Sequence, residues 1–332
     1  MNWHYDPHIR NAYAYQFNFG IQHQINKTTT LTASYVSALT HRANIGGMYN
    51  TALQPSPLPN PQSRSLYPYM ISTFYDRSVG FADYHAFQLS LDKRLSSGLS
   101  YQVAYTFSKA LDENDGWFGA EGKNVADPYN PRASLSPAGF DIPHNFVVNT
   151  TYELPIGKGK RFSSGNHAVD YIVGNWQVNG IITIRSGQRY SVTDQNGDPA
   201  NTGNVGWAGY EQANLVGNPD SGSCTSGAAV HTQTCWFNTN AFQAPALGTF
   251  GNIRPDAFHA QRYWNADFSI FRGFPIMGEG RKLEFRAEAF NLFNTVIWAA
   301  PNGDVSNSGG FGKVTDTANS ARVLQFGLRF MF

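Results

Sequence analysis

Residues 322–332 read RVLQFGLRFMF, and their apolar side chains recur at every second position. One face of an extended segment carries Leu324, Phe326, Leu328, Phe330 and Phe332;. The other face carries Gln325, Gly327, Arg329 and Met331. The chain ends on an aromatic residue, so no later turn or tail shields the apolar face from water. Lipid can shield it, and a strand of about 9 to 11 residues crosses a bilayer. The segment therefore predicts a transmembrane β-strand.

The composition favours a β-barrel with a wet lumen. Aromatic and charged residues each make up 14% of the 332 residues, and the mean hydropathy is −0.37. No apolar run approaches the roughly 18 residues that a transmembrane helix needs. The net charge of +1 leaves no basic footprint for nucleic acid;. These features exclude a helical membrane protein and a nucleic-acid-binding protein.

The first residues, MNWHYD, contain no basic stretch followed by an apolar core. A secretory signal peptide has both of these features, and an exported protein needs one. We therefore expect a truncated gene product whose upstream part is missing.

Period-two alternation recurs along the whole chain and predicts eight strands before the terminal one. Their ranges are 12–25, 28–38, 87–92, 99–110, 146–155, 176–185, 264–271 and 281–292. The segment with four prolines at 55–61 reads as a surface loop, because proline cannot donate to a ladder;. No sustained period is visible over 188–262, and residues 273–280 are expected to join the last hairpin.

The eight connections alternate between short and long, apart from one of moderate length after Pro155. Outer-membrane barrels sort their connections in this way, with short periplasmic turns and long extracellular loops. Nine antiparallel strands leave the first and the last running in the same direction, whereas single-chain bacterial barrels have even strand counts. The sequence therefore predicts an all-β, antiparallel transmembrane barrel segment of about nine strands that stays open.

Several segments resemble the C-terminal barrel half of Oar-like TonB-dependent receptors, which carry a carboxypeptidase-regulatory-like domain at their N-terminus. The matching stretches are YHAFQLSLDKR (84–94), YTFSKALD (105–112), YELPIGKGKRF (152–162), GNWQ (174–177), FRAEAFNLFN (285–294) and the ending from Arg322. The ending also resembles the C-terminal assembly signal of outer-membrane proteins, which Gly327, Phe330 and Phe332 match. This second resemblance implies the barrel assembly machinery as a partner.

The family resemblance implies a location in the cell outer membrane and active import through a larger, 22-stranded barrel. In such receptors loops and a plug capture the substrate, and TonB pulls on the plug. Residues 1–332 show no plug, TonB box or regulatory domain, so we expect one partial barrel that reaches the TonB complex only through a missing N-terminal part. A structural or adhesive outer-membrane barrel is the first alternative. A soluble secreted β-protein that binds glycans through its aromatic residues is the second.

Five charged residues are expected on the lumen side of the last three strands: Asp267, Glu284, Arg286, Glu288 and Arg329. Opposite charges on adjacent strands can pair across a sheet. One interpretation is a selectivity lining for a transported substrate. The alternative is a ladder that only satisfies a polar lumen, which is the more common use of such residues.

Cys224 and Cys235 are the only cysteines, and both lie in the longest loop. Two thiols this close in an exported protein favour a disulfide over two free thiols. A zinc site is disfavoured, because His231 is the only further ligand between them.

Two other motifs fail on inspection. The first is a possible calcium loop. The spacing of Asp194, Asn196 and Asp198 is that of the opening of an EF-hand loop. However, Pro199 stands in place of its glycine and Val205 in place of its bidentate glutamate, so a polar turn is favoured over a calcium contact;.

The second is a possible hydrolase site. His144 and Asn145 lie near Asp141 in the sequence, but no serine completes such a site. We therefore expect no enzyme and no cofactor.

Overall fold

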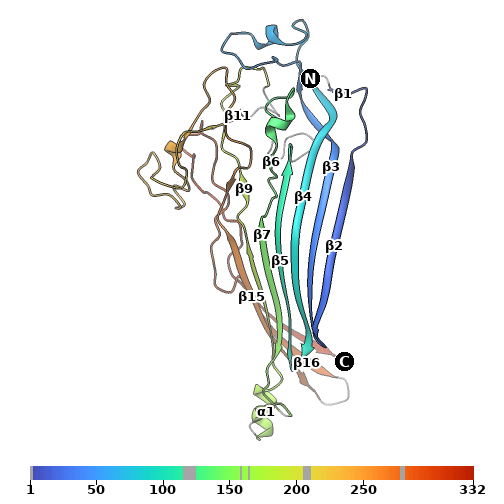
Figure 1. Cartoon of the computed structure of the whole chain (residues 1–332). Helices are drawn as coiled ribbons and strands as arrows, with labels where there is room; N and C mark the ends of the chain where they lie inside the picture. The colour runs from blue at the N-terminus through green and yellow to red at the C-terminus, as the bar shows by residue number, and fades with distance from the viewer. Residues whose placement is uncertain (1–2, 115–124, 158, 164, 205–210, 277–280) are drawn as a thin grey trace.

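The computed structural model describes residues 3–114, 125–157, 159–163, 165–204, 211–276 and 281–332. Nine long strands form one antiparallel sheet in which each strand pairs with the next in sequence (Figure 1). They are β2 (Tyr13–Asn26), β3 (Thr29–Tyr49), β4 (Thr73–Ser96), β5 (Leu99–Asp112), β7 (His144–Glu153), β8 (Gln177–Arg185), β15 (Tyr263–Pro275), β16 (Lys282–Phe290) and β17 (Val323–Met331). Two short strands join the sheet, β1 (Trp3–Tyr5) beside β4 and β6 (Ser136–Pro137) beside β5.

The register carries one apolar face across all nine strands. One row of directly paired residues runs through Leu31, Leu91, Val103, Val148 and Ile182. Paired residues share a face, so these side chains line the same surface. The predicted outer set is confirmed on this face by the register: Phe17, Phe19, Leu89, Tyr101, Val103, Val148, Phe268, Phe285, Leu328 and Phe330.

The opposite face is polar along the same strands. A neighbouring row pairs Thr30 with Asp92, Asp92 with Gln102 and Gln102 with Asn149. The Gln102 Nε2 donates to Asp92 Oδ1 at 2.8 Å. Because lipid-exposed barrels alternate apolar-out and polar-in, we assign the apolar face to lipid and the polar face to the lumen.

The sheet is open, as predicted. Within the described residues β2 and β17 form the two edges, and no ladder joins them. The predicted alternation of connections is also confirmed, because the short turns gather at one end of the sheet and the long loops at the other (Figure 1). Both edges are consequently available to further strands.

The third and fourth strands are longer than the sequence predicted. Residues 39–49 and 73–86 were expected in a loop, but they extend the β3–β4 hairpin beyond the apolar face. The two-residue period breaks at a bulge between His41 and Asn44, where Arg42 has φ of 57°. Ile45, Met48 and Phe74 in this extension are buried. These residues pack against the loops and do not face lipid, so their positions in the sequence do not alternate with period two.

Two other boundaries differ from the prediction. Gly273 belongs to β15, which runs on to Pro275, and residues 277–280 of that predicted connection lie outside the described residues. The moderate connection between β7 and β8 contains a short helix, α1 (His167–Val173), that the sequence did not predict. None of the helices within the described ranges is long and apolar enough to span a membrane.

The region 188–262 has no sequence period, and its described residues, 188–204 and 211–262, fold into a compact lobe at the long-loop end. It is built from strands of two residues each: β9 (Arg189–Tyr190), β10 (Thr193–Asp194), β11 (Glu211–Gln212), β12 (Asn214–Leu215), β13 (Phe242–Gln243) and β14 (Phe258–His259). Its core packs Tyr190, Phe237 and Phe242 with Phe258 and Phe311. We call this region, with residues 297–318 that pack on it, the loop lobe.

Candidate functional site

The predicted charged residues lie on the polar face, but their ion pairs differ from the expectation. Arg286 Nη2 lies 3.2 Å from Glu284 Oε1, and Arg286 Nη1 lies 3.8 Å from Glu288 Oε1, both within β16. The register places Arg329 of β17 directly opposite Glu284. Residues two apart on one strand share a face, so they compete with cross-strand partners. The Arg286 side chain is half exposed, and each pair contributes only about 0 to 1 kcal/mol;.

Asp267 has a different set of partners. Its Oδ1 accepts from Asn265 Nδ2 and from the backbone N–H of Asn291, each at 2.8 Å. The Asn291 contact fixes the turn that follows β16. Asp267 therefore lies on the polar face and also holds the end of β16 in place.

A cleft of about 880 Å³ lies where the polar face meets the loop lobe. Arg185 and Tyr263 pair across β8 and β15 at its floor, and the guanidinium carbon of Arg185 lies 4.4 Å from the Tyr263 ring centroid. Trp298 and Gln261 line the same cleft, and Gln261 Oε1 accepts from the Trp298 backbone N–H at 2.7 Å. The cleft thus combines aromatic surface with hydrogen-bonding groups.

An ion pair fastens the loop lobe to the sheet beside this cleft. Arg189 Nη2 and Nε donate to Asp141 Oδ2 at 2.8 and 3.1 Å. Asp141 is fully buried, and its other oxygen accepts from the Ala110 backbone N–H at 2.8 Å. Removing either partner would leave a buried charge unpaired, which is strongly destabilising.

The sequence did not identify the residues of this cleft. Arg185 and Tyr263 are ordinary members of the polar phase of their strands, and Trp298 lies in a segment without a period. Only the three-dimensional packing of the lobe brings them together.

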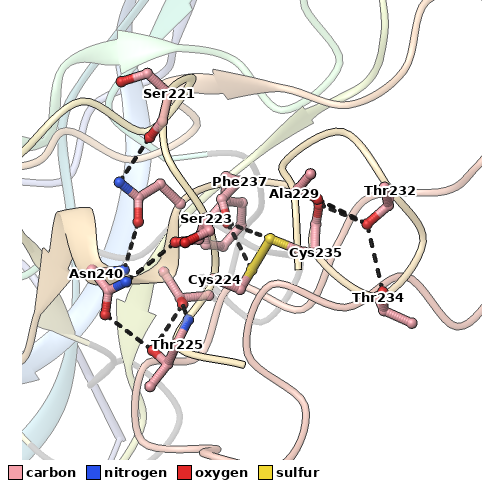
Figure 2. The surroundings of a disulfide bond; sticks show 12 residues. Ser221, Ser223, Cys224, Thr225, Ala229, Thr232, Thr234, Cys235, Phe237 and Asn240 are labelled. Atoms are coloured by element: carbon pink, nitrogen blue, oxygen red, sulfur yellow. Dashed lines mark hydrogen bonds between the residues drawn. A yellow bond between two sulfur atoms is a disulfide. The ribbon is translucent and has the colours of Figure 1, made fainter. Parts of the chain in front are cut away.

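Figure 2 shows the two cysteines joined inside the loop lobe. Their sulfurs are 2.06 Å apart and their Cα atoms 5.8 Å apart, and both side chains are buried. Asn238 Nδ2 donates to the Ser221 carbonyl oxygen at 2.8 Å, and Asn240 Nδ2 donates to that of Ser223 at 3.2 Å. His231 packs edge-on against Trp236. The disulfide in the isolated protein stays a prediction.

The segment with EF-hand-like spacing forms a polar turn beside a buried carboxyl. The Asn196 backbone N–H donates to Asp194 Oδ1 at 3.0 Å, and the Gly203 N–H donates to Asp198 Oδ2 at 2.5 Å. In the β10–β11 ladder Asp194 lies directly opposite Glu211. Within the described ranges no group of three or more His, Cys, Asp or Glu side chains is arranged to hold a metal ion.

Glu211 is the most perturbed carboxyl of the loop lobe. Burial raises the pKa of Glu211 to about 8, and the charges of Asp198, Asp194 and Asp127 add to the shift. Its Oε2 has no hydrogen-bond partner in the described part of the chain. This raised pKa favours the protonated form of Glu211 at neutral pH.

The two residues considered for catalysis, His144 and Asp141, have different partners. His144 pairs with Phe107 on the apolar face, and its Nδ1 lies 2.8 Å from the Tyr105 hydroxyl. Asp141 binds Arg189 instead. The two side chains do not form a shared site.

The residues that match the assembly signal end the last strand. The Phe330 and Phe332 rings are stacked with centroids 5.9 Å apart, and Phe332 is almost fully exposed. Gly327 lies opposite Arg286 on the polar face. The strand thus presents aromatic groups to lipid up to the end of the chain.

A curved antiparallel sheet with one apolar face, one polar face and connections sorted by length defines the wall of an outer-membrane β-barrel. The chain belongs to the outer membrane beta barrel domain family, whose family model matches residues 2–325. It is therefore an outer-membrane protein. A comparison with curated proteins finds no match.

Among solved structures, the chain is similar to the outer membrane transporter YddB from Escherichia coli, with 10% identity and a TM-score of 0.49 over 98% of this chain and 33% of YddB. The ferric-catecholate import receptor Fiu from E. coli K12 gives 13% identity and a TM-score of 0.45 over 98% of this chain and 28% of Fiu. The pyoverdine outer membrane receptor FpvA from Pseudomonas aeruginosa PAO1 gives 11% identity and a TM-score of 0.46 over 98% of this chain and 30% of FpvA. The chain spans about a third of the length of these structures.

Proposed function

We propose that this chain forms part of the wall and the extracellular loops of an Oar-like TonB-dependent transporter. The observation that carries the proposal is a polar path along the lumen face. It runs from the Arg286 ion pairs through Asp267 and Asn265 on β15 to the cleft floored by Tyr263 and Arg185. A substrate captured in the cleft would meet hydrogen-bonding groups along this path. In this role the charged ladder acts as a selectivity lining.

We also propose that the sheet is part of a larger barrel. The resemblance to Oar-like receptors implies 22 strands, of which residues 1–332 contribute nine. The edge strands β2 and β17 run in the same direction, so closing this sheet on itself would need a parallel pair;. The β2 edge carries exposed aromatic and aliphatic side chains, and Phe19 and Ile21 are among them. Edges of this kind aggregate unless another strand covers them. Additional antiparallel strands would cover both edges.

The partners follow from this architecture. Outer-membrane lipid contacts the apolar face, the barrel assembly machinery would insert the β17 end, and the TonB complex would act through a plug supplied outside this chain. The alternative is an adhesive or structural barrel without energy coupling, which the large loop lobe at the long-loop end favours.

Binding of TonB separates the two functions. The natural product of the gene, isolated from outer membranes in detergent, should retain the purified periplasmic domain of TonB. Retention of the TonB domain supports transport through a plug. Absence of any retention, with normal membrane insertion, would establish the adhesive or structural alternative.

A further inference from the structure

The connection between β7 and β8 is an ordered element in its described residues, 154–157, 159–163 and 165–176, which we call the periplasmic foot. It projects from the short-turn end of the sheet (Figure 1). The Leu154 N–H donates to the Trp176 carbonyl oxygen at 2.8 Å, and the Asn175 N–H donates to that of Ile156 at 2.9 Å. The two legs of the foot touch, since a Cβ on Gly174 would lie 2.6 Å from the Gly157 Cα. The foot is therefore held in one arrangement relative to the sheet.

Helix α1 is fixed within the foot by side-chain contacts. The Asn166 side chain caps its first turn by accepting from the Ala168 N–H at 2.9 Å;. Ser163 Oγ donates to Asp170 Oδ2 at 2.6 Å, and Asp170 is buried. The helix consequently presents one defined side to its surroundings.

The foot packs on the lipid-facing side of the sheet. Phe274 belongs to the apolar phase of β15, where it pairs with Leu283, which pairs with Phe330. The Tyr171 ring lies 5.9 Å from the Phe274 ring, and its hydroxyl donates to the Pro275 carbonyl oxygen at 3.0 Å. The foot therefore continues the lipid-facing surface at its periplasmic rim.

Arg272 explains why this surface is covered. It also belongs to the apolar phase of β15, opposite Phe285, yet it is only 2% exposed. Its guanidinium carbon lies 4.4 Å from the Phe274 ring centroid, 5.7 Å from that of Tyr171 and 5.9 Å from that of Trp176. It also donates to the Ile172 carbonyl oxygen. An arginine on the lipid face is tolerated near the membrane interface and is costly deeper in the bilayer. The shielded cation thus places the foot at the depth of the lipid headgroups.

The outer surface of the foot is apolar with a basic margin. Exposed apolar side chains come from Phe162, Val169, Tyr171, Ile172 and Val173, and Ile172 is 65% exposed. Lys160 and Arg161 are exposed beside Phe162, and the guanidinium carbon of Arg161 lies 5.5 Å from the Phe162 ring centroid. The nearby acidic groups are accounted for, because Glu153 pairs with Lys160 at 3.1 Å and Asp170 is buried.

We propose that the periplasmic foot is a lipid-binding element that lies in the periplasmic leaflet of the outer membrane. The apolar side of α1 enters the boundary between headgroups and acyl chains, as interfacial amphipathic segments do. Arg161 binds the phosphate group of an anionic phospholipid. The occupant is lipid because the foot is continuous with the lipid-facing band and because Arg161 places an exposed cation at its margin.

Site-specific fluorescence tests this placement on the full chain in nanodiscs of phosphatidylethanolamine with or without phosphatidylglycerol. A single NBD label is attached at Ile172→Cys or, as a control, at Ser97→Cys in the β4–β5 turn at the same end of the sheet. The introduced cysteine is the only free thiol when Cys224 and Cys235 are joined. Label at position 172 should be quenched several-fold more by headgroup-region nitroxide lipids than label at position 97. Equal quenching at the two positions would overturn the proposal. Shielding of position 172 from labelling in native outer membranes but not in nanodiscs would also overturn it, because it would indicate a protein partner.

The basic margin has a separate readout. Arg161→Gln should lower the enrichment of phosphatidylglycerol in lipid that copurifies with the chain by about fivefold, the usual effect of one cation at an anionic surface. The Arg94→Gln variant, at an exposed arginine near the β4–β5 turn, is the matched control and should change it less. An unchanged enrichment in Arg161→Gln would overturn the assignment of this margin to anionic lipid.

Discussion

Replacing Glu211 with glutamine should abolish most of the pH dependence of loop-lobe stability between pH 5 and 8. Glu211 is 2% exposed, and burial together with the neighbouring Asp198 and Asp194 raises its pKa from 4.5 to about 8. A carboxyl with a raised folded-state pKa binds more protons in the folded state than in the unfolded state at intermediate pH. The free energy of unfolding of the wild-type lobe is therefore highest below about pH 4.5, falls as pH rises towards 8 and then levels off.

The size of the effect follows from the same shift. Each pH unit between the two pKa values removes about 1.4 kcal/mol, so the whole window removes at most about 5 kcal/mol. Glutamine stays neutral, so Glu211→Gln should match the wild type near pH 5 and exceed its stability by several kcal/mol at pH 8.5. Pulse proteolysis of the lobe across a urea series measures this stability while the barrel stays inserted. Asp220→Asn, at an exposed carboxylate of the same lobe, should keep the wild-type slope. Parallel slopes for the wild type and Glu211→Gln would refute the reasoning.

Three further variants test other parts of the structure. In denaturant without reductant, maleimide should label the Cys235 thiol of Cys224→Ser but not the wild type, and ready labelling of the wild type would reject the disulfide. Cys224→Ser should also destabilise the lobe by about 3 kcal/mol, the loop-closure value for a separation of 11 residues;. Deletion of Phe332 should lower heat-modifiable, inserted protein in outer-membrane fractions without blocking export, and normal insertion would remove this residue from the assembly signal. Leu89→Lys on the apolar face should destabilise the inserted sheet by about 2 to 4 kcal/mol, whereas Gln88→Lys on the polar face should have little effect; equal effects would contradict the assignment of faces;.

Alternation identified the strands where lipid and lumen impose it. In residues 99–110 every second side chain, such as Val103 or Tyr105, faces lipid, so the sequence alone located β5 and its facing. The upper part of the β3–β4 hairpin escaped detection because it lies beyond the membrane. There Ile45 and Phe74 pack under loops, and no two-residue rule applies.

The loop lobe and the foot could not be predicted for a related reason. The lobe core draws single residues such as Tyr190, Phe242 and Phe258 from separate two-residue strands, so the local sequence shows no period. In the charged ladder the facing of Arg286 was predictable. Its choice of Glu284 and Glu288 over cross-strand partners was not, because both arrangements place the charges on one face.

The central claim is that the apolar face of this sheet contacts lipid and the polar face contacts water. A nitroxide scan along β17, one cysteine at a time in membrane-inserted protein, measures this most directly. Oxygen, which concentrates in lipid, should relax labels at positions 324, 326, 328 and 330. A water-soluble nickel chelate should relax labels at 325, 327 and 329 instead. Accessibility without a two-residue period, or with the two sets exchanged, would contradict this assignment of the apolar face to lipid and the polar face to water.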